Sequence, residues 1–311
     1  MAALVENMFS VRETPWHGMG IIVQDAPTSL DAIKLAGLDW KVEQREMCIA
    51  GTDLKVPDAY ANIRTSDMKV LGVVGNRYQI VQNEDAFSFT DNLIGEGCVY
   101  ETAGSLREGK QIWLLARLPE SIQIAGDEVV PYLVFTNTFD GSGAIRVAMT
   151  PTRVVCNNTL NLALQTAKRT WSARHTGSIE AKLEEATETL QLANKYMAEL
   201  KAKSEELALK PIDNDKLIKL IDFVIPVPED MKGKARENLV AKKNDIWRRY
   251  QFAPDLKVMD KTALRFVHAV ADTATHMEPA RRTKNYRENL FLNTMNGNAL
   301  IDKAYDVAMA V

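Results

Sequence analysis

The sequence predicts an α+β protein: a twisted antiparallel sheet of successive hairpins packed on helices, followed by a mostly helical C-terminal region. The first half contains short alternating apolar stretches separated by turn residues, which is typical of hairpins. A heptad stripe follows, and the apolar residues after it recur at helical spacing. We therefore expect an α+β core over residues 1–177, a long heptad-patterned helix over 178–209 and a helical region over 210–311.

Two helices and several strands are expected in the core. One helix is predicted over 28–38, and another starts with Asn83 as its cap, has acidic residues in its first turn and stops near Gly95. Glycine tolerates a positive φ, so the sequence DGSG at 140–143 predicts a tight reversal between two strands. The expected strands are 40–49, 60–65, 69–74, 99–106, 111–117, 129–137 and 144–149, with a return to extended chain at 170–175.

The remainder is expected to be largely helical. The segment 154–167 has the pattern of a buried helix, and the proline-punctuated, acidic segment 210–230 is expected to be a boundary. Three further helices are predicted: one capped by Glu229 or Asp230 and running to Tyr250, one over 262–276 and one over 299–311.

The heptad stripe has two interpretations. Its apolar residues alternate spacings of four and three between Ile179 and Leu200. In the first interpretation the helix lies across a sheet or another helix of the same chain. In the second, the stripe is a seam through which copies of the chain associate.

The composition is that of an ordinary folded chain. It has 311 residues, of which 46% are hydrophobic and 25% charged, and its net charge is −3. No window approaches the ~18 unbroken apolar residues of a membrane helix, and the first residues lack the regions of a signal peptide. The widely spaced Cys48, Cys98 and Cys156 indicate buried thiols in a reducing compartment. We expect a cytoplasmic protein without a membrane partner.

Signatures of catalysis are missing from the sequence. It contains no phosphate-binding GxxxxGK[ST] loop, no GxGxxG after a strand and no GxSxG nucleophile turn. Of the four histidines, His268 and His276 share a predicted helix but lie two turns apart, too far to hold one ion. The sequence thus favours a protein that is not an enzyme and needs no cofactor or metal; a hydrolase or nuclease would need a clustered carboxylate or histidine site.

Local charge is uneven although the net charge is small. Between Asp140 and Ser178 the only acid is Asp140, so this stretch forms a basic strip that could follow a phosphate backbone. The alternative is that several of its arginines pair with the acidic helix over 180–206. A basic run over 232–249 fits a solvated helix face. The candidate nucleic-acid-binding residues are Arg146, Arg153, Lys168, Arg169 and Arg174, with Arg281, Arg282 and Lys284 as a second site.

Five short motifs resemble a phage- and plasmid-encoded family, domain of unknown function 932. They are PWHG at 15–18, AGLDW at 36–40, YQIVQN at 78–83, DGSG at 140–143 and TPTRVVCNNT at 150–159. This resemblance implies no catalytic residues. The hairpin with its DGSG turn, followed by a basic helical segment, is also similar to the core of single-strand annealing recombinases of the Rad-fifty-two type, which form rings on single-stranded DNA.

Together these observations lead to two hypotheses about function. The first is a phage- or plasmid-encoded protein that binds and anneals single-stranded DNA without ATP. Its basic residues would contact the phosphate backbone, and it would assemble as a homo-oligomer, for example a ring. The second is a protein-interaction module that acts on a host or defence protein. Binding that weakens steeply with salt distinguishes the first from the second.

Overall fold

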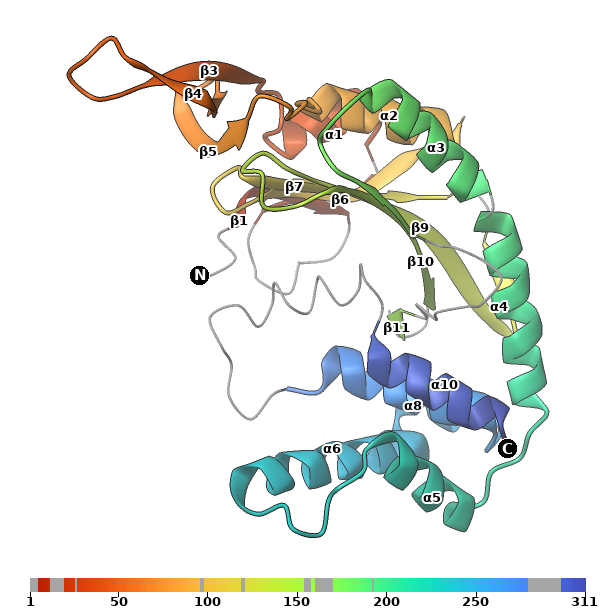
Figure 1. Ribbon diagram of the computed structural model, residues 1–311. Coiled ribbons are helices and arrows are strands. Elements are labelled where there is room, and N and C mark those ends of the chain that lie inside the picture. Colours follow the sequence, from red (N-terminus) through yellow and green to blue (C-terminus); the bar gives the residue numbers. More distant parts are fainter. Residues whose placement is uncertain are drawn as a thin grey trace. The chain divides into compact units, whose positions relative to one another are not determined.

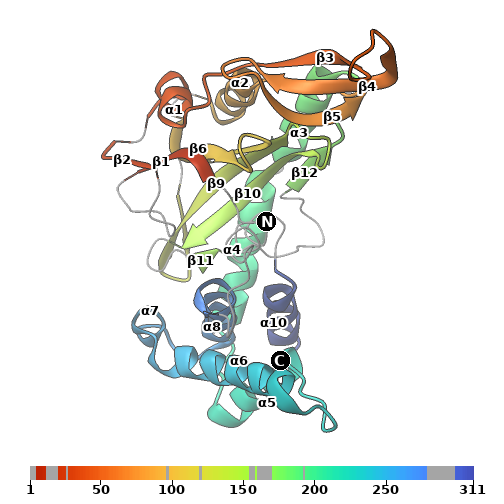
Figure 2. The same ribbon diagram turned by 90° about the vertical axis from the view of Figure 1, so that its left-hand side faces the viewer.

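The computed structural model describes residues 5–11, 20–25, 27–95, 98–118, 121–153, 158–159, 170–191, 193–278 and 298–311. The chain divides into two compact units (Figures 1 and 2). The first comprises Met1–Pro119, Tyr132–Met149 and Arg169–Leu192, and the second comprises Glu120–Pro131, Thr150–Lys168 and Ala193–Val311.

The main sheet is built largely from antiparallel neighbours, as the hairpin pattern predicts. Its strands follow the order β11-β10-β9-β7-β6-β1-β2, with β12 paired to β10 and β8 paired to β9. The pair β1–β2 is parallel. The strands are β1 (Val5–Val11), β2 (Ile21–Val23), β6 (Val99–Leu106), β7 (Gln111–Arg117), β8 (Ile122–Ile124), β9 (Asp127–Thr138), β10 (Ile145–Arg153), β11 (Asn158–Thr159) and β12 (Thr170–Ala173).

A second, smaller sheet lies in the first unit. It consists of the antiparallel strands β3 (Val42–Cys48), β4 (Lys55–Arg64) and β5 (Lys69–Gly75). Strand β4 begins five residues before the expected strand at 60–65, and it pairs with both neighbouring strands.

The expectation of buried thiols is wrong for Cys48, which ends β3 and is exposed. Cys98 is half-buried, and burial raises the pKa of its thiol to about 12.

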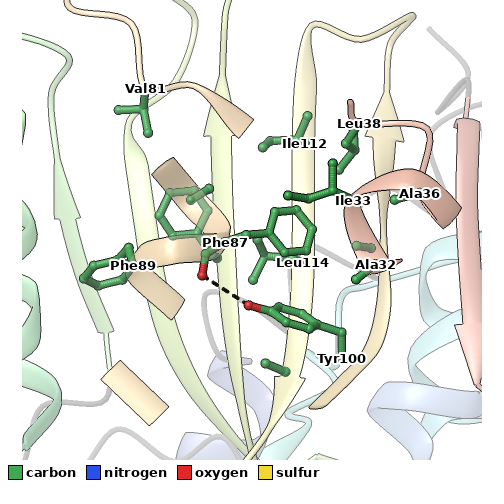
Figure 3. Packing of buried hydrophobic residues seen from close by; sticks show 14 of the residues in the cluster. Ala32, Ile33, Ala36, Leu38, Val81, Phe87, Phe89, Tyr100, Ile112 and Leu114 are labelled. Atoms are coloured by element: carbon green, nitrogen blue, oxygen red, sulfur yellow. Dashed lines mark hydrogen bonds between the residues drawn. The ribbon is translucent and has the colours of Figure 1, made fainter. Parts of the chain in front are cut away.

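Three helices of the first unit lie over one face of the main sheet: α1 (Ser29–Leu35), α2 (Asn83–Ile94) and α3 (Ile179–Gln191) (Figure 1). Their apolar sides and the strands beneath them form the core of this unit. Figure 3 shows Phe87 of α2 packed beside Leu114 of β7 and Tyr100 of β6, all of them buried. Phe89 points to the other side of α2, where its ring centroid is 5.9 Å from that of Phe135 of β9. The Tyr100 hydroxyl is 2.7 Å from an Asp91 carboxylate oxygen, so the buried phenol keeps a polar partner.

The start of α2 differs from the prediction. Asn83 was expected to cap this helix, but the cap is Gln82, whose backbone N–H donates to the Asp85 carboxylate at 2.9 Å. Asn83 is the first helical residue, and its amide donates to the Leu38 and Trp40 carbonyls. An asparagine at a helix start can satisfy distant carbonyls as well as its own helix, and spacing alone does not distinguish these roles.

The heptad stripe is divided between two helices, α3 and α4 (Ala193–Ala208). Ile179 and Leu183 of α3 pack against the core of the first unit, and Ala186 is part of that core. In α4, Met197 and Leu200 are buried. These side chains are therefore covered within the chain, which favours the first interpretation of the stripe over an open seam for self-association.

The described C-terminal part is helical, and with the hairpin-built sheet it confirms the predicted fold class. The segment 210–230, expected to be a boundary, contains α5, and α6 begins at Gly233 instead of next to Glu229 or Asp230. The buried-helix prediction for 154–167 falls outside the described residues apart from the two residues of β11. The helices here are α5 (Asn214–Val224), α6 (Gly233–Phe252), α7 (Pro254–Lys257), α8 (Ala263–His276) and α10 (Ala299–Met309).

Two arginines, the half-buried Arg249 and the buried Arg265, tie the helices of the second unit together. Arg249 of α6 bridges Asp245 on its own helix, at 2.5 Å, and Asp272 on α8, at 2.6 Å. Arg265 of α8 donates to the carbonyls of Tyr250 and Met259 at 2.7 and 2.8 Å. The Arg265 guanidinium thereby satisfies the Tyr250 carbonyl near the C-terminal end of α6 and the Met259 carbonyl in the segment that follows α7.

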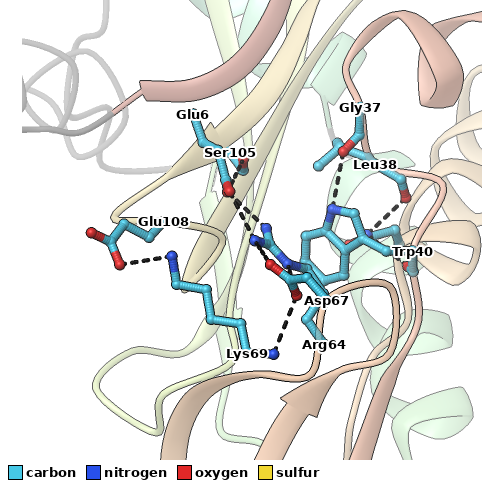
Figure 4. Close-up of polar contacts among 10 residues, drawn as sticks. Glu6, Gly37, Leu38, Trp40, Arg64, Asp67, Lys69, Ser105 and Glu108 are labelled. Atoms are coloured by element: carbon cyan, nitrogen blue, oxygen red, sulfur yellow. Dashed lines mark hydrogen bonds and ion pairs between the residues drawn. The ribbon is translucent and has the colours of Figure 1, made fainter.

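The first unit holds a comparable buried charge at Arg64, on β4 (Figure 4). Its guanidinium donates two hydrogen bonds to Glu6, both at 2.8 Å, and two to Asp67, at 2.9 and 2.6 Å. It also lies 5.5 Å from the centre of the Trp40 ring. Two bidentate carboxylates give an arginine a nearly complete set of partners, which offsets the cost of removing it from water. The Arg64 guanidinium lowers the pKa of Asp67 to about 2.

We expect Arg64→Ala to lower the free energy of unfolding by about 2–4 kcal/mol, because it leaves two carboxylates without their common partner. Urea denaturation followed by circular dichroism measures the change. The control is Arg45→Ala. Arg45 is exposed on β3, and its ion pair with Glu43 is long, at 3.5 Å, and exposed to solvent. Its removal is therefore expected to lower the free energy of unfolding by at most about 0.5 kcal/mol. Equal losses in the two variants would contradict a structural role specific to Arg64.

Candidate functional site

A hollow of about 710 Å³ opens in the first unit where three segments of the chain meet. They are the end of β5 with the residues after it (73–78), the turn between β9 and β10 with the start of β10 (140–146), and the residues that follow β12 (174–176). Asp58 of β4 completes the lining. The hollow therefore depends on long-range packing and not on one local motif.

Strand β12 lies beside β10 (Figure 2), and this pairing brings two of the predicted arginines together. Arg146 lies opposite Ser172 in this antiparallel register, so Arg174 is a diagonal neighbour on the same face. Diagonal neighbours of this kind are roughly 7–8 Å apart. Both arginines are exposed and both line the hollow.

A third arginine, Arg77, enters the hollow from the segment after β5. It was not among the predicted site residues, because it lies about seventy residues before the basic strip. Within the described residues, no ion pair involves the side chain of Arg77 or Arg174. At Arg174 the structure therefore does not support the alternative in which arginines of the basic strip pair with the acidic helix. Both side chains are exposed.

Tyr78 and His175 hold two of the three segments together. Their rings are stacked with centroids 4.5 Å apart. The backbone N–H of Gln79 donates to the His175 carbonyl at 2.8 Å, and the His175 Nδ1 lies 3.0 Å from the Gln79 carbonyl. The Tyr78 hydroxyl donates to the Thr138 carbonyl at 2.5 Å, which connects this pair to the end of β9.

The turn between β9 and β10 is held from both sides. Asp140 Oδ1 accepts hydrogen bonds from the Ser142 N–H at 2.9 Å and from its hydroxyl at 2.6 Å. Gly141 has a φ of +74°, a conformation that favours glycine. Gly72 of β5 lies against the turn so closely that a Cβ there would be 2.4 Å from the Asp140 Cα. These features confirm the predicted reversal at 140–143 and show that β5 must approach it closely.

The charge of the hollow comes from its arginines. Burial lowers the pKa of His175, so its ring is neutral at pH 7, and burial raises the pKa of Tyr78. Two carboxylates face three guanidinium groups: Asp140 is engaged by the turn, and Asp58 accepts a hydrogen bond from Asn76 at 2.5 Å. The lining therefore carries a net positive charge and suits an anion with several oxygens, such as a phosphodiester.

Of the other predicted residues, the structure places Arg153 alone, and it is not part of the lining. Arg153 is the last residue of β10, pairs with Asn158 of β11 and belongs to the second unit. The remaining predicted residues, Lys168, Arg169, Arg281, Arg282 and Lys284, lie outside the described part of the chain.

Neither a metal-binding cluster nor a membrane-spanning helix occurs in the described ranges. No group of three or more histidine, cysteine or acidic side chains is placed there to hold a metal ion. Among the helices of the same ranges, none is both long enough and apolar enough to cross a membrane.

The fold and the hollow define a class of protein: an α+β protein whose exposed arginines converge on one hollow beside a sheet edge. The chain belongs to the family described as Domain of unknown function (DUF932), whose model matches residues 70–294. This match covers all three segments of the hollow and confirms the family that the sequence motifs indicate. Neither the search of curated proteins nor that of solved structures finds a match to the chain.

We expect the stability of the first unit to fall as the pH drops below about 6.5, the ordinary pKa of histidine. The lowered pKa of His175 in the folded state means that the unfolded chain takes up a proton first, which favours unfolding below that pH. One such group contributes at most about 1.4 kcal/mol per pH unit. Urea denaturation at pH 5 to 7.5 measures how the free energy of unfolding changes with pH. The control, His175→Phe, keeps a ring beside Tyr78 but does not titrate, so an unchanged pH dependence in this variant contradicts the assignment.

Proposed function

We propose that this protein binds single-stranded DNA through the phosphate backbone and anneals complementary strands without ATP. The observation that carries the proposal is the convergence of Arg77, Arg146 and Arg174, from three separate segments, on one hollow. Exposed guanidinium groups are suited to phosphate oxygens because each presents several donors in a fixed plane. The resemblance to Rad-fifty-two-type annealing proteins and to a phage- and plasmid-encoded group supports the same function in the host cytoplasm.

This site favours backbone contacts over base recognition. Its aromatic ring, Tyr78, is stacked on His175 and half-buried, so that ring is engaged within the protein. Guanidinium contacts to phosphates carry no sequence information and release condensed counterions. The proposal therefore implies binding that is independent of sequence and strongly weakened by salt.

We expect Arg146→Ala and Arg174→Ala each to lower the affinity for a labelled single-stranded oligonucleotide about tenfold at 50 mM salt, because a hydrogen bond to a charged group is lost. Together they should reduce the slope of log Kd against log salt by about 1.4, at ~0.7 per phosphate contact. Fluorescence anisotropy measures both quantities. Arg77→Ala tests the third arginine in the same way, and Arg45→Ala is the matched exposed control outside the hollow.

The same measurements contain the result that overturns the proposal. No binding at low salt, or an affinity and salt slope unchanged in the Arg146→Ala, Arg174→Ala double variant, contradicts a phosphate site at this hollow. The protein-interaction alternative would then explain the surface better.

Annealing and assembly need their own readouts. The rate at which two complementary oligonucleotides pair, measured without ATP, is expected to rise with the wild-type protein and to fall toward the uncatalysed rate with the double variant. Light scattering with and without the oligonucleotide reports the proposed homo-oligomer, including a ring.

A further inference from the structure

Helix α6, in the second unit, exposes one face that carries two large aromatic side chains. Beyond Asn238 the exposed positions of this helix are 241, 244, 247, 248 and 252, a spacing of three to four that marks a single face. Trp247 is 38% exposed and Phe252 is 61% exposed. Their ring centroids lie 5.8 Å apart in an edge-to-face arrangement.

The exposure of these rings does not come from a helix that lacks packing. The opposite face of α6 buries Ile246 and Tyr250. That face also carries Arg249, which forms ion pairs with Asp245 and with Asp272 of α8. The helix is thus already anchored in its unit, and the aromatic pair is additional apolar surface that the fold does not use.

Basic residues lie on the N-terminal part of the helix face that carries the aromatic pair. With 100° of rotation and 1.5 Å of rise per residue, Arg236 and Trp247 lie on one stripe of the exposed face, about 17 Å apart along the helix axis. A neighbouring stripe holds Lys234, Arg248 and Phe252. Over residues 232–261 nine lysines and arginines stand against four acids, a net charge of +5 in a chain whose total is −3. The surroundings of the rings therefore suit a polyanion that also offers flat apolar groups.

We propose that Trp247 and Phe252 form a platform on which bases of single-stranded nucleic acid stack, while Lys234 and Arg236 contact the phosphates. The inference rests on the proposed function and extends it from the backbone to the bases. Stacking on exposed aromatic rings tolerates any base because every base has a flat π face. Charge complementarity selects nucleic acid as the occupant, since an apolar protein partner would gain nothing from the cations along the same helix.

The test compares two ligands with equal numbers of phosphates: an oligothymidine and an abasic oligonucleotide of the same length. The wild-type protein is expected to bind the oligothymidine about 5- to 100-fold more tightly, the range for stacking of one base on an aromatic side chain. The double variant Trp247→Ala, Phe252→Ala should lose this preference and keep its affinity for the abasic strand. Trp247→Phe retains a ring and should keep most of the preference.

Phe223→Ala provides the matched control, because Phe223 is a 63% exposed aromatic side chain on α5 with a lysine, Lys303, 5.5 Å from its ring. Its removal should leave the preference unchanged. Circular dichroism confirms that each variant is folded, which is expected for substitutions at exposed positions.

Distinct outcomes separate this inference from the proposed function. Equal affinity of the wild-type protein for both strands, or a preference that survives in the double variant, overturns the stacking platform and leaves backbone binding intact. Failure of the wild-type protein to bind either strand overturns both. Self-association that the double variant abolishes, with an unchanged base preference, assigns the rings to contacts between copies and also overturns the platform.

Discussion

The antiparallel pairing of β12 with β10 is the constraint on which the candidate site depends. Four residue pairs, from Ile145 with Ala173 to Ala148 with Thr170, return the chain to the sheet edge. That register makes Arg146 and Arg174 neighbours and places His175 where it meets Tyr78. A shift by one residue would turn Arg174 to the other face, because side chains alternate along a strand. The register of β12 against β10 therefore determines which side chains line the hollow.

Arginine has two different roles in this protein, and burial separates them. Arg64 and Arg249 are largely removed from water, and each is held by two carboxylates, since a buried charge without partners is very costly. Arg77 and Arg174 are exposed, and no ion pair among the described residues engages them. A guanidinium that already has two carboxylates has few donors left for a ligand. Exposed arginines remain competent for phosphate, which makes them the better candidates for binding.

The proposed chemistry differs between the two units. In the first, the rings near the arginines are engaged with each other, and the neutral His175 adds no charge, so the hollow offers guanidinium groups for phosphate. In the second, Trp247 and Phe252 are exposed on a helix that also carries exposed cations, and they offer flat surface for bases. The net charge of −3 does not indicate either basic region, because it sums their positive charges with the negative charges of the acidic helices.

The sequence by itself determined those features whose causes lie within a few residues. The hairpin of β6 and β7 and the reversal at 140–143 follow from alternation and turn residues, and the basic strip that contains Arg146 and Arg174 follows from composition. The tertiary structure alone decided that Arg77 joins them, that Gln82 and not Asn83 caps α2, and that Trp247 is exposed. Burial, ion pairing and register arise between residues far apart in the chain, so local spacing carries no information about them.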